Sequence, residues 1–164
     1  MANEMPYTPV RRVVTGHDDN VAIAVMDGQA RNTIFPAPGT ASTTLWSTDQ
    51  MPADIAVGKN IEDYAERKLS IPPAINGTRF AIIEFAPGNG AFMHRTETVD
   101  YVVVISGEID MDMDNSSVKL KAGDVVVQRG TNHAWANRGT VPARIAVVLV
   151  DAKPLGIGKA IPRA

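Results

Sequence analysis

The stretch that decides the fold lies at residues 88–137 and contains two key segments, GNGAFMHRTETVDYVVVISG (88–107) and GDVVVQRGTNHAWAN (123–137). Short runs of Val in both segments are interrupted by Gly and Asn at close intervals. Gly and Asn supply the backbone conformations of tight turns, and β-branched side chains favour strands. These segments therefore predict an all-β fold of many short strands.

The same pattern extends outward to residues 78–151, which predict about eight short strands and hence a sandwich or barrel. The chain contains no internal repeat and no linker long enough to divide it. We therefore expect one domain over residues 1–164, with a barrel core at 78–151 and N-terminal strands and an arm at 1–77. The elements expected in this arm are strands over 10–15, 21–27 and 43–48, a loop over 28–41 and a polar, partly helical stretch over 51–73, with its helix formers at 61–69.

Composition excludes several classes of function. The 164 residues carry a formal net charge of −2 with scattered cationic residues, which argues against nucleic-acid partners and anionic membrane surfaces. The chain has no cysteine, which removes disulfides, thiolate metal sites and cysteine nucleophiles. No stretch approaches the roughly 20 apolar residues of a membrane helix. The N-terminus lacks the apolar segment of a signal peptide, so we expect a cytoplasmic protein.

Two of the three histidines, His94 and His133, stand on segments expected to face one interior. Side chains alternate across a strand, so every second residue shares a face. The expected inward sets are Phe92, His94 and Thr96; Asp100, Val102 and Val104; and His133, Trp135 and Asn137. If these faces line one barrel, two imidazoles and a carboxylate meet in a mostly apolar pocket.

The spacing of these residues resembles the two cupin motifs. The first, G-x5-H-x-H-x3–4-E-x6-G, corresponds to Gly88, His94, Thr96, Asp100 and Gly107, with Thr for the second His and Asp for Glu. The second, G-x5-P-x-G-x2-H-x3-N, corresponds to Gly123, Gln128, Gly130, His133 and Asn137, with Gln for Pro and one interval a residue shorter. The resemblance implies a cupin double-stranded β-helix (jelly-roll) barrel with extra N-terminal strands, usually a homodimer.

The resemblance also implies a divalent metal, held in cupins by three His and one Glu. This chain retains an incomplete set of His94, Asp100 and His133, the ligand types of a facial triad that suits Fe(II), with Zn, Mn or Ni as alternatives. Without a metal, His94 and His133, with Asp100, are the candidate catalytic acid/base groups. His17 is either a solvated turn residue or a further ligand in the position that Thr96 leaves vacant.

The remaining candidates are substrate-binding residues. Trp46, Phe92 and Trp135 are either core residues or the apolar walls of the pocket, and Thr96 lies between the ligand positions. Arg129, which follows Gln128, is either a surface charge or an anchor for a substrate carboxylate at the pocket mouth.

Three functions stay open at this point. The first is a lyase of decarboxylase type acting on an apolar or aromatic acid or phenol, and the second is an iron-dependent dioxygenase. The third is a non-catalytic small-molecule-binding cupin. A narrower resemblance to small stand-alone cupins of aromatic catabolism and polyketide clusters, named decarboxylases or oxidoreductases, favours an enzyme with a small-molecule partner.

Overall fold

The computed structural model describes residues 5–163, which contain strands and no helix. The strands are β1 (Arg11–Asp18), β2 (Val21–Gln29), β3 (Thr33–Ala37), β4 (Thr40–Thr48), β5 (Thr78–Phe85), β6 (Thr98–Ser106), β7 (Glu108–Met113), β8 (Ser117–Lys121), β9 (Val125–Arg129), β10 (His133–Ala136) and β11 (Ala143–Asp151). The predicted all-β fold is confirmed. Within the described range no helix is suited to cross a membrane.

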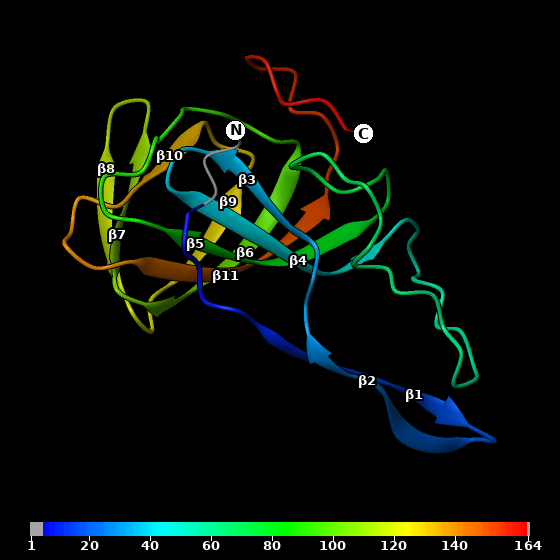
Figure 1. Ribbon diagram of the computed structural model, residues 1–164. Coiled ribbons are helices and arrows are strands. Elements are labelled where there is room, and N and C mark those ends of the chain that lie inside the picture. The colour runs from blue at the N-terminus through cyan, green and yellow to red at the C-terminus, as the bar shows by residue number, and fades with distance from the viewer. Residues whose placement is uncertain (1–4, 164) are drawn as a thin grey trace.

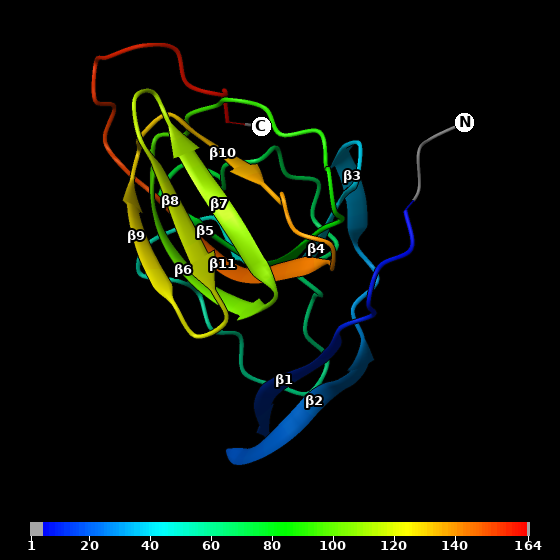
Figure 2. The same ribbon diagram turned by 90° about the vertical axis from the view of Figure 1, so that its left-hand side faces the viewer.

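Two sheets face each other and enclose the core (Figures 1 and 2). The larger sheet has the order β3-β4-β5-β11-β6-β9 and the smaller has the order β10-β7-β8. In β11, Ile145, Val147 and Leu149 are buried, because alternate side chains of this central strand point into the space between the sheets. In β7, Ile109 and Met111 are likewise buried, between carboxylates that are less buried.

The N-terminal strands β1 and β2 form a separate two-stranded sheet that projects from the barrel (Figure 1). Arg12 ties this hairpin to the rest of the chain by donating to both carboxylate oxygens of Asp63 and to the Leu45 carbonyl oxygen. The expected extra N-terminal strands are therefore present.

Two expectations for the N-terminal half are wrong. Residues 28–41, expected to be a loop, contain β3 and the start of β4, so the barrel sheet begins well before residue 78. Polar residues form these strands because their hydroxyls pair across the sheet, as Thr33 and Thr43 do at 2.8 Å.

Residues 51–73, expected to be partly helical around 61–69, contain no helix. A nine-residue helix is marginal in isolation. In this structure the side chains of residues 61–69 make tertiary contacts instead. The Tyr64 ring packs on Trp46 with centroids 5.2 Å apart, and the Arg67 guanidinium carbon lies 3.6 Å from the Tyr64 ring centroid.

The outer face of the barrel carries an apolar patch on β6 and the edge strand β9. Tyr101 and Val103 lie opposite Val127 and Val125 in the sheet register, and these four residues are between 45% and 70% exposed. Exposed apolar patches at a sheet edge mark interaction surfaces. We propose that this patch is the interface of a homodimer.

A charge placed in this patch is expected to separate the dimer. Val127→Asp should give the mass of one chain by light scattering, because an unpaired carboxylate is costly in an apolar interface. Val141→Asp is the matched control, since Val141 is 58% exposed in a loop outside the patch, and its mass should equal that of the wild type. A wild-type protein with the mass of one chain would contradict the proposal.

Candidate functional site

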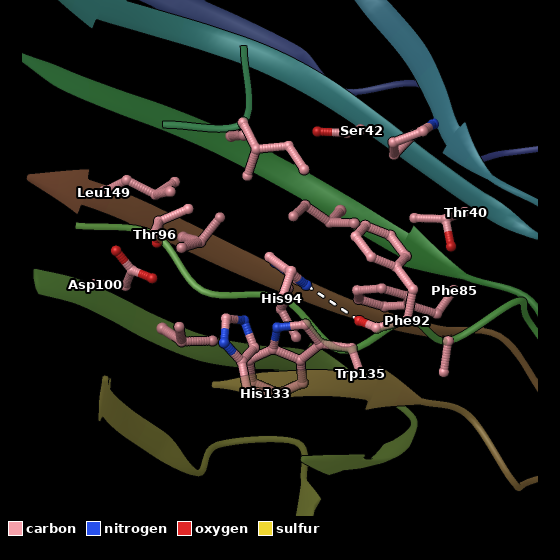
Figure 3. Close-up of a pocket in the computed structure, with 18 of the residues that line it drawn as sticks. Thr40, Ser42, Phe85, Phe92, His94, Thr96, Asp100, His133, Trp135 and Leu149 are labelled. Carbon is pink, nitrogen blue, oxygen red and sulfur yellow. Dashed lines mark hydrogen bonds between the residues drawn. The ribbon is translucent and has the colours of Figure 1, made fainter. Parts of the chain in front are cut away.

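A cavity of about 90 Å³ lies inside the barrel between the two sheets (Figure 3). Its apolar lining comes mainly from β5, β11 and β6, and its polar lining from β4, β5, the segment 86–97, β6, β9 and β10. Six of the predicted site residues line it: Phe92, His94, Thr96, Asp100, His133 and Trp135. The sequence patterns thus identified residues that the fold does bring together, and their roles in binding and catalysis stay predictions.

The two histidines meet because their backbones pair. His94 and His133 donate to each other's carbonyl oxygens at 2.9 Å, although His94 lies on a non-strand segment. Residues 91–96, expected to be a strand, therefore form only this isolated bridge. The bridge holds the two imidazoles against each other, with ring centroids 4.3 Å apart, and the Phe92 ring lies 4.7 Å from His94 (Figure 3).

Both histidines are held in one tautomer. Nδ1 of His94 lies 3.1 Å from the Phe92 carbonyl oxygen, and Nδ1 of His133 lies 3.0 Å from the Thr131 carbonyl oxygen. A carbonyl oxygen only accepts, so each Nδ1 carries the hydrogen and each neutral ring keeps a lone pair on Nε2. In the described part of the chain neither Nε2 has a hydrogen-bond partner.

Burial keeps both imidazoles neutral at neutral pH. Burial lowers the pKa of His133 to about 4, with a further contribution from the adjacent His94. Burial also lowers the pKa of His94. Both effects follow from the cost of placing a cation in a low-dielectric interior. The pair therefore presents two neutral bases to the cavity.

Asp100 is buried in the cavity wall, and one neighbouring side chain is hydrogen-bonded to its carboxylate. The Gln128 side-chain amide donates to Asp100 Oδ2 at 2.6 Å across the β6–β9 register. Asp100 Oδ1 and Gln128 Oε1 are buried without a partner among the described residues. Burial raises the pKa of Asp100 to about 6, because the charged carboxylate is desolvated.

Arg79 also lines the cavity, and sequence reasoning missed it. Its guanidinium is buried and donates only to neutral oxygens: the Ser42 and Thr44 hydroxyls and the Ser70 and Ile71 carbonyls. No carboxylate pairs with it in residues 5–163. Burial lowers its pKa. Strand alternation was the available signal, because Arg79 shares a face of β5 with Ala81, Ile83 and Phe85.

Trp46 does not line the cavity, so its predicted role as an apolar wall of the pocket is wrong. It lies in a separate hollow on the outer side of the sheet with Tyr64 and Phe80. In a regular strand Trp46 would share the inward face of Thr40, Ser42 and Thr44, because every second residue points the same way. The register of β4 against β5 shifts between Thr44 and Trp46, so Trp46 pairs with the outward Phe80. Such a bulge moves the following residue to the other face.

Arg129 and His17 also lie outside the cavity. Gln128 is buried and lines the cavity, so its neighbour Arg129 points outward into another hollow. His17 is exposed on the projecting β1, where its backbone bridges to Gly58. It does not reach the ligand position that Thr96 leaves vacant.

The predicted three-ligand metal site is not assembled in this structure. The two free Nε2 atoms are suitable donors for a divalent ion. Among the described residues, however, no group of three His, Cys, Asp or Glu is arranged to hold a metal. The Asp100 carboxylate is instead bound by Gln128 through one oxygen. The residues present therefore do not form a complete metal site.

Comparison with known proteins identifies the family. The cupin domain model matches residues 81–150. The chain is 35% identical over 165 residues to oryzines biosynthesis cluster protein J of Aspergillus oryzae, across 93% of this chain and 88% of that protein. It is 33% identical over 149 residues to the cupin-domain-containing oxidoreductase fogC of Aspergillus ruber, across 87% of this chain and 72% of that protein. The chain belongs to the cupin family, and the predicted cupin jelly-roll fold is confirmed.

Other relatives are longer than this chain. Phomopsin biosynthesis cluster protein C′ of Diaporthe leptostromiformis is 43% identical over 117 residues, across 68% of this chain. The matched part is 61% of the length of that protein. The chain therefore spans about three fifths of the length of that relative.

The ionisation of Asp100 is expected to make stability depend on pH. A carboxyl whose pKa is higher in the folded state stabilises the fold below about pH 4, and this contribution is lost as the pH rises through 6. His133 has the opposite effect over a similar range, since its folded pKa is depressed. The test must therefore compare variants at two pH values.

Asp100→Asn removes the cost of ionising this site. Between pH 4 and pH 8 its free energy of unfolding should rise, relative to the wild type, by up to about 3 kcal/mol, from roughly two pKa units at about 1.4 kcal/mol each. Urea unfolding at both pH values measures this difference. Exposed Asp54→Asn is the control and should show no such change. An Asp100→Asn difference that is the same at both pH values would contradict the buried ionisation.

Proposed function

We propose that this protein is a small-molecule enzyme that transfers protons on an apolar phenolic acid, as a lyase of decarboxylase type. The observation that carries the proposal is the pair of neutral imidazoles with free Nε2 atoms in the cavity wall. A positioned neutral imidazole is the commonest general base in enzymes.

The unpaired polar atoms of the cavity select for a ligand that donates hydrogen bonds. The Nε2 atoms of His94 and His133 accept, and so do Asp100 Oδ1 and Gln128 Oε1. A phenolic or other hydroxyl is a donor that suits these acceptors. The sequence left an acid and a phenol open as ligands. The phenolic hydroxyl has the better-defined hydrogen-bond partners in this cavity.

A carboxylate on the same ligand is favoured by Arg79. This buried cation has no carboxylate partner in the described chain, so a nearby anion is stabilised by its field. Arg79 replaces Arg129 as the cation expected to favour an acidic group. Its donors are already satisfied, so its contribution is electrostatic.

The size of the cavity supports a small, flat ligand. Its volume of about 90 Å³ is below the roughly 150 Å³ of an apolar cavity that holds benzene. The reacting end of the ligand would enter the cavity while its body lies at the mouth. Phe92, which is 41% exposed and packs on His94, is placed to contact that body.

The reaction follows from these groups. An imidazole Nε2 accepts the phenolic proton, which raises the electron density on the ring. The bond between the ring carbon and the carboxylate breaks, CO₂ leaves, and the ring carbon takes one proton from the protonated imidazole. The phenolate regains its proton from water, so one proton replaces one CO₂ and the enzyme is unchanged.

An oxidoreductase is the second candidate, since relatives such as fogC are named cupin-domain-containing oxidoreductases. The two free Nε2 atoms are also the donors that a metal would need for such chemistry. A cupin that binds small molecules without turnover is the third candidate.

Loss of His133 is expected to remove turnover. A panel of hydroxybenzoates would first be screened for CO₂ release by the wild type. His133→Ala should then reduce the rate at least about a hundredfold, the usual size of a general-base contribution, with an unchanged circular dichroism spectrum. His17→Ala is the matched control, because this histidine is exposed and outside the cavity. Full activity of His133→Ala would refute the catalytic assignment, and saturable binding without turnover would favour the non-catalytic cupin.

Metal removal separates the first two candidates. The proposed lyase should release CO₂ without oxygen uptake and should keep its rate after dialysis against a chelator, because none of its steps uses a metal or oxygen. An oxygen electrode and elemental analysis of the dialysed protein measure both. Oxygen uptake that is lost with the chelator and restored by Fe(II) would establish the oxidoreductase instead.

A further inference from the structure

The outer side of the segment that carries His94 forms a second polar hollow. Side chains alternate along this extended segment, so Arg95 points away from the cavity that His94 and Thr96 line. The hollow lies between the β7–β8 turn, the β9–β10 connection and the C-terminal tail. In Figure 2 the tail, in red, arches over this end of the barrel. We call it the Arg95 hollow; its lining includes Arg95, Asp114, Ser116, Arg129, Asn132 and Lys159.

The Arg95 guanidinium is buried but largely unpartnered. The side chain is only 6% exposed, yet Nε and Nη1 have no hydrogen-bond partner among the described residues. Its Nη2 lies 3.7 Å from Glu97 Oε1, and Glu97 is shared with Arg163 at 3.4 Å. A buried cation is costly unless it is paired and hydrogen-bonded, so this guanidinium lacks partners that an anion would supply.

The rest of the hollow has the charge and donors that suit an anion. Arg129 and Lys159 are exposed and add two cations to that of Arg95. Asp114 is the carboxylate of the described lining, and its Oδ1 already accepts from Asn132 at 2.6 Å. Ser116 and Thr131 add hydroxyl donors. Oxyanions bind where several N–H and O–H donors converge with cationic charge.

The tail covers the guanidinium closely. The Ile161 amide donates to the Arg95 carbonyl oxygen at 2.7 Å, which anchors the tail beside Arg95. A Cβ added to Gly158 would lie 3.8 Å from Arg95 Nε, so the backbone passes directly over the charge. Gly158 has a φ of +58°, a conformation that glycine adopts at little cost. The tail therefore forms one wall of the hollow.

We propose that the Arg95 hollow binds a small oxyanion, such as a phosphate group, beneath the C-terminal tail. This site is separate from the cavity between the sheets, and it does not depend on the proposed reaction. The anion would be held by Arg95 Nε and Nη1 from the barrel side and by Arg129 and Lys159 from the rim. Inorganic phosphate or a phosphate ester would supply the same chemistry.

Calorimetric titration with inorganic phosphate at constant ionic strength tests this site in the full chain. We expect saturable binding by the wild type. Arg95→Met, which keeps the apolar stem and removes the charge, should weaken binding at least about tenfold, as for a lost charge-assisted contact. Arg129→Ala and Lys159→Ala change exposed residues and should each weaken binding several-fold without threatening the fold. Lys153→Ala is the control, since this exposed tail lysine is outside the hollow.

A second measurement covers the case in which Arg95→Met does not fold. The thermal unfolding midpoint should rise with phosphate in the wild type and in Lys153→Ala, because a ligand that binds only the folded state stabilises it. The rise should be smaller for Arg129→Ala and Lys159→Ala. Equal rises in all of these variants, or no saturable binding of either inorganic phosphate or glucose 6-phosphate by the wild type, would overturn the proposal. A response to glucose 6-phosphate but not to inorganic phosphate would identify a phosphate ester as the ligand form.

Discussion

The candidate site depends on one pair of backbone hydrogen bonds, those that His94 and His133 exchange at 2.9 Å. They join the segment 86–97, which follows β5 of the large sheet, to β10 of the small sheet. Asn89 reinforces this join, because its side chain donates to the Trp135 carbonyl oxygen and accepts from the Asn137 amide. The Gly88 amide adds a bond to the Asn137 carbonyl oxygen at 2.8 Å. The two imidazoles are therefore positioned by backbone pairing between the sheets.

Burial then determines the chemistry of the groups that this pairing brings together. Desolvation favours the neutral form of each group, so it lowers the pKa of both histidines and raises that of Asp100. The result is a cavity with two neutral bases and a carboxyl that titrates near neutral pH. The same residues in water would be partly cationic imidazoles and a fully ionised carboxylate.

Two buried arginines show how differently the fold treats the same side chain. Every N–H of Arg79 is bound to a neutral oxygen, so it acts as a fixed charge in the cavity wall. Arg95 has two nitrogens without partners within residues 5–163 and lies under a tail that crosses it closely. A satisfied guanidinium suits an electrostatic role, whereas an unsatisfied one suits a ligand that supplies the missing acceptors.

The sequence by itself determined the strand-rich fold and the histidine and aspartate residues of the cavity, because turn residues and the two-residue period of strands are local properties. The period placed His94, Thr96, Asp100, His133 and Trp135 on inward faces, as found. The same period turns Arg79 inward, which was not inferred, and turns Arg129 outward, in agreement with the surface charge that was one of its two predicted roles. Local pattern could not locate the bulge before Trp46, since a register shift depends on how β4 pairs with β5. Only the tertiary structure decided that Asp100 binds Gln128 and that the tail covers Arg95, because these contacts join residues far apart in the chain.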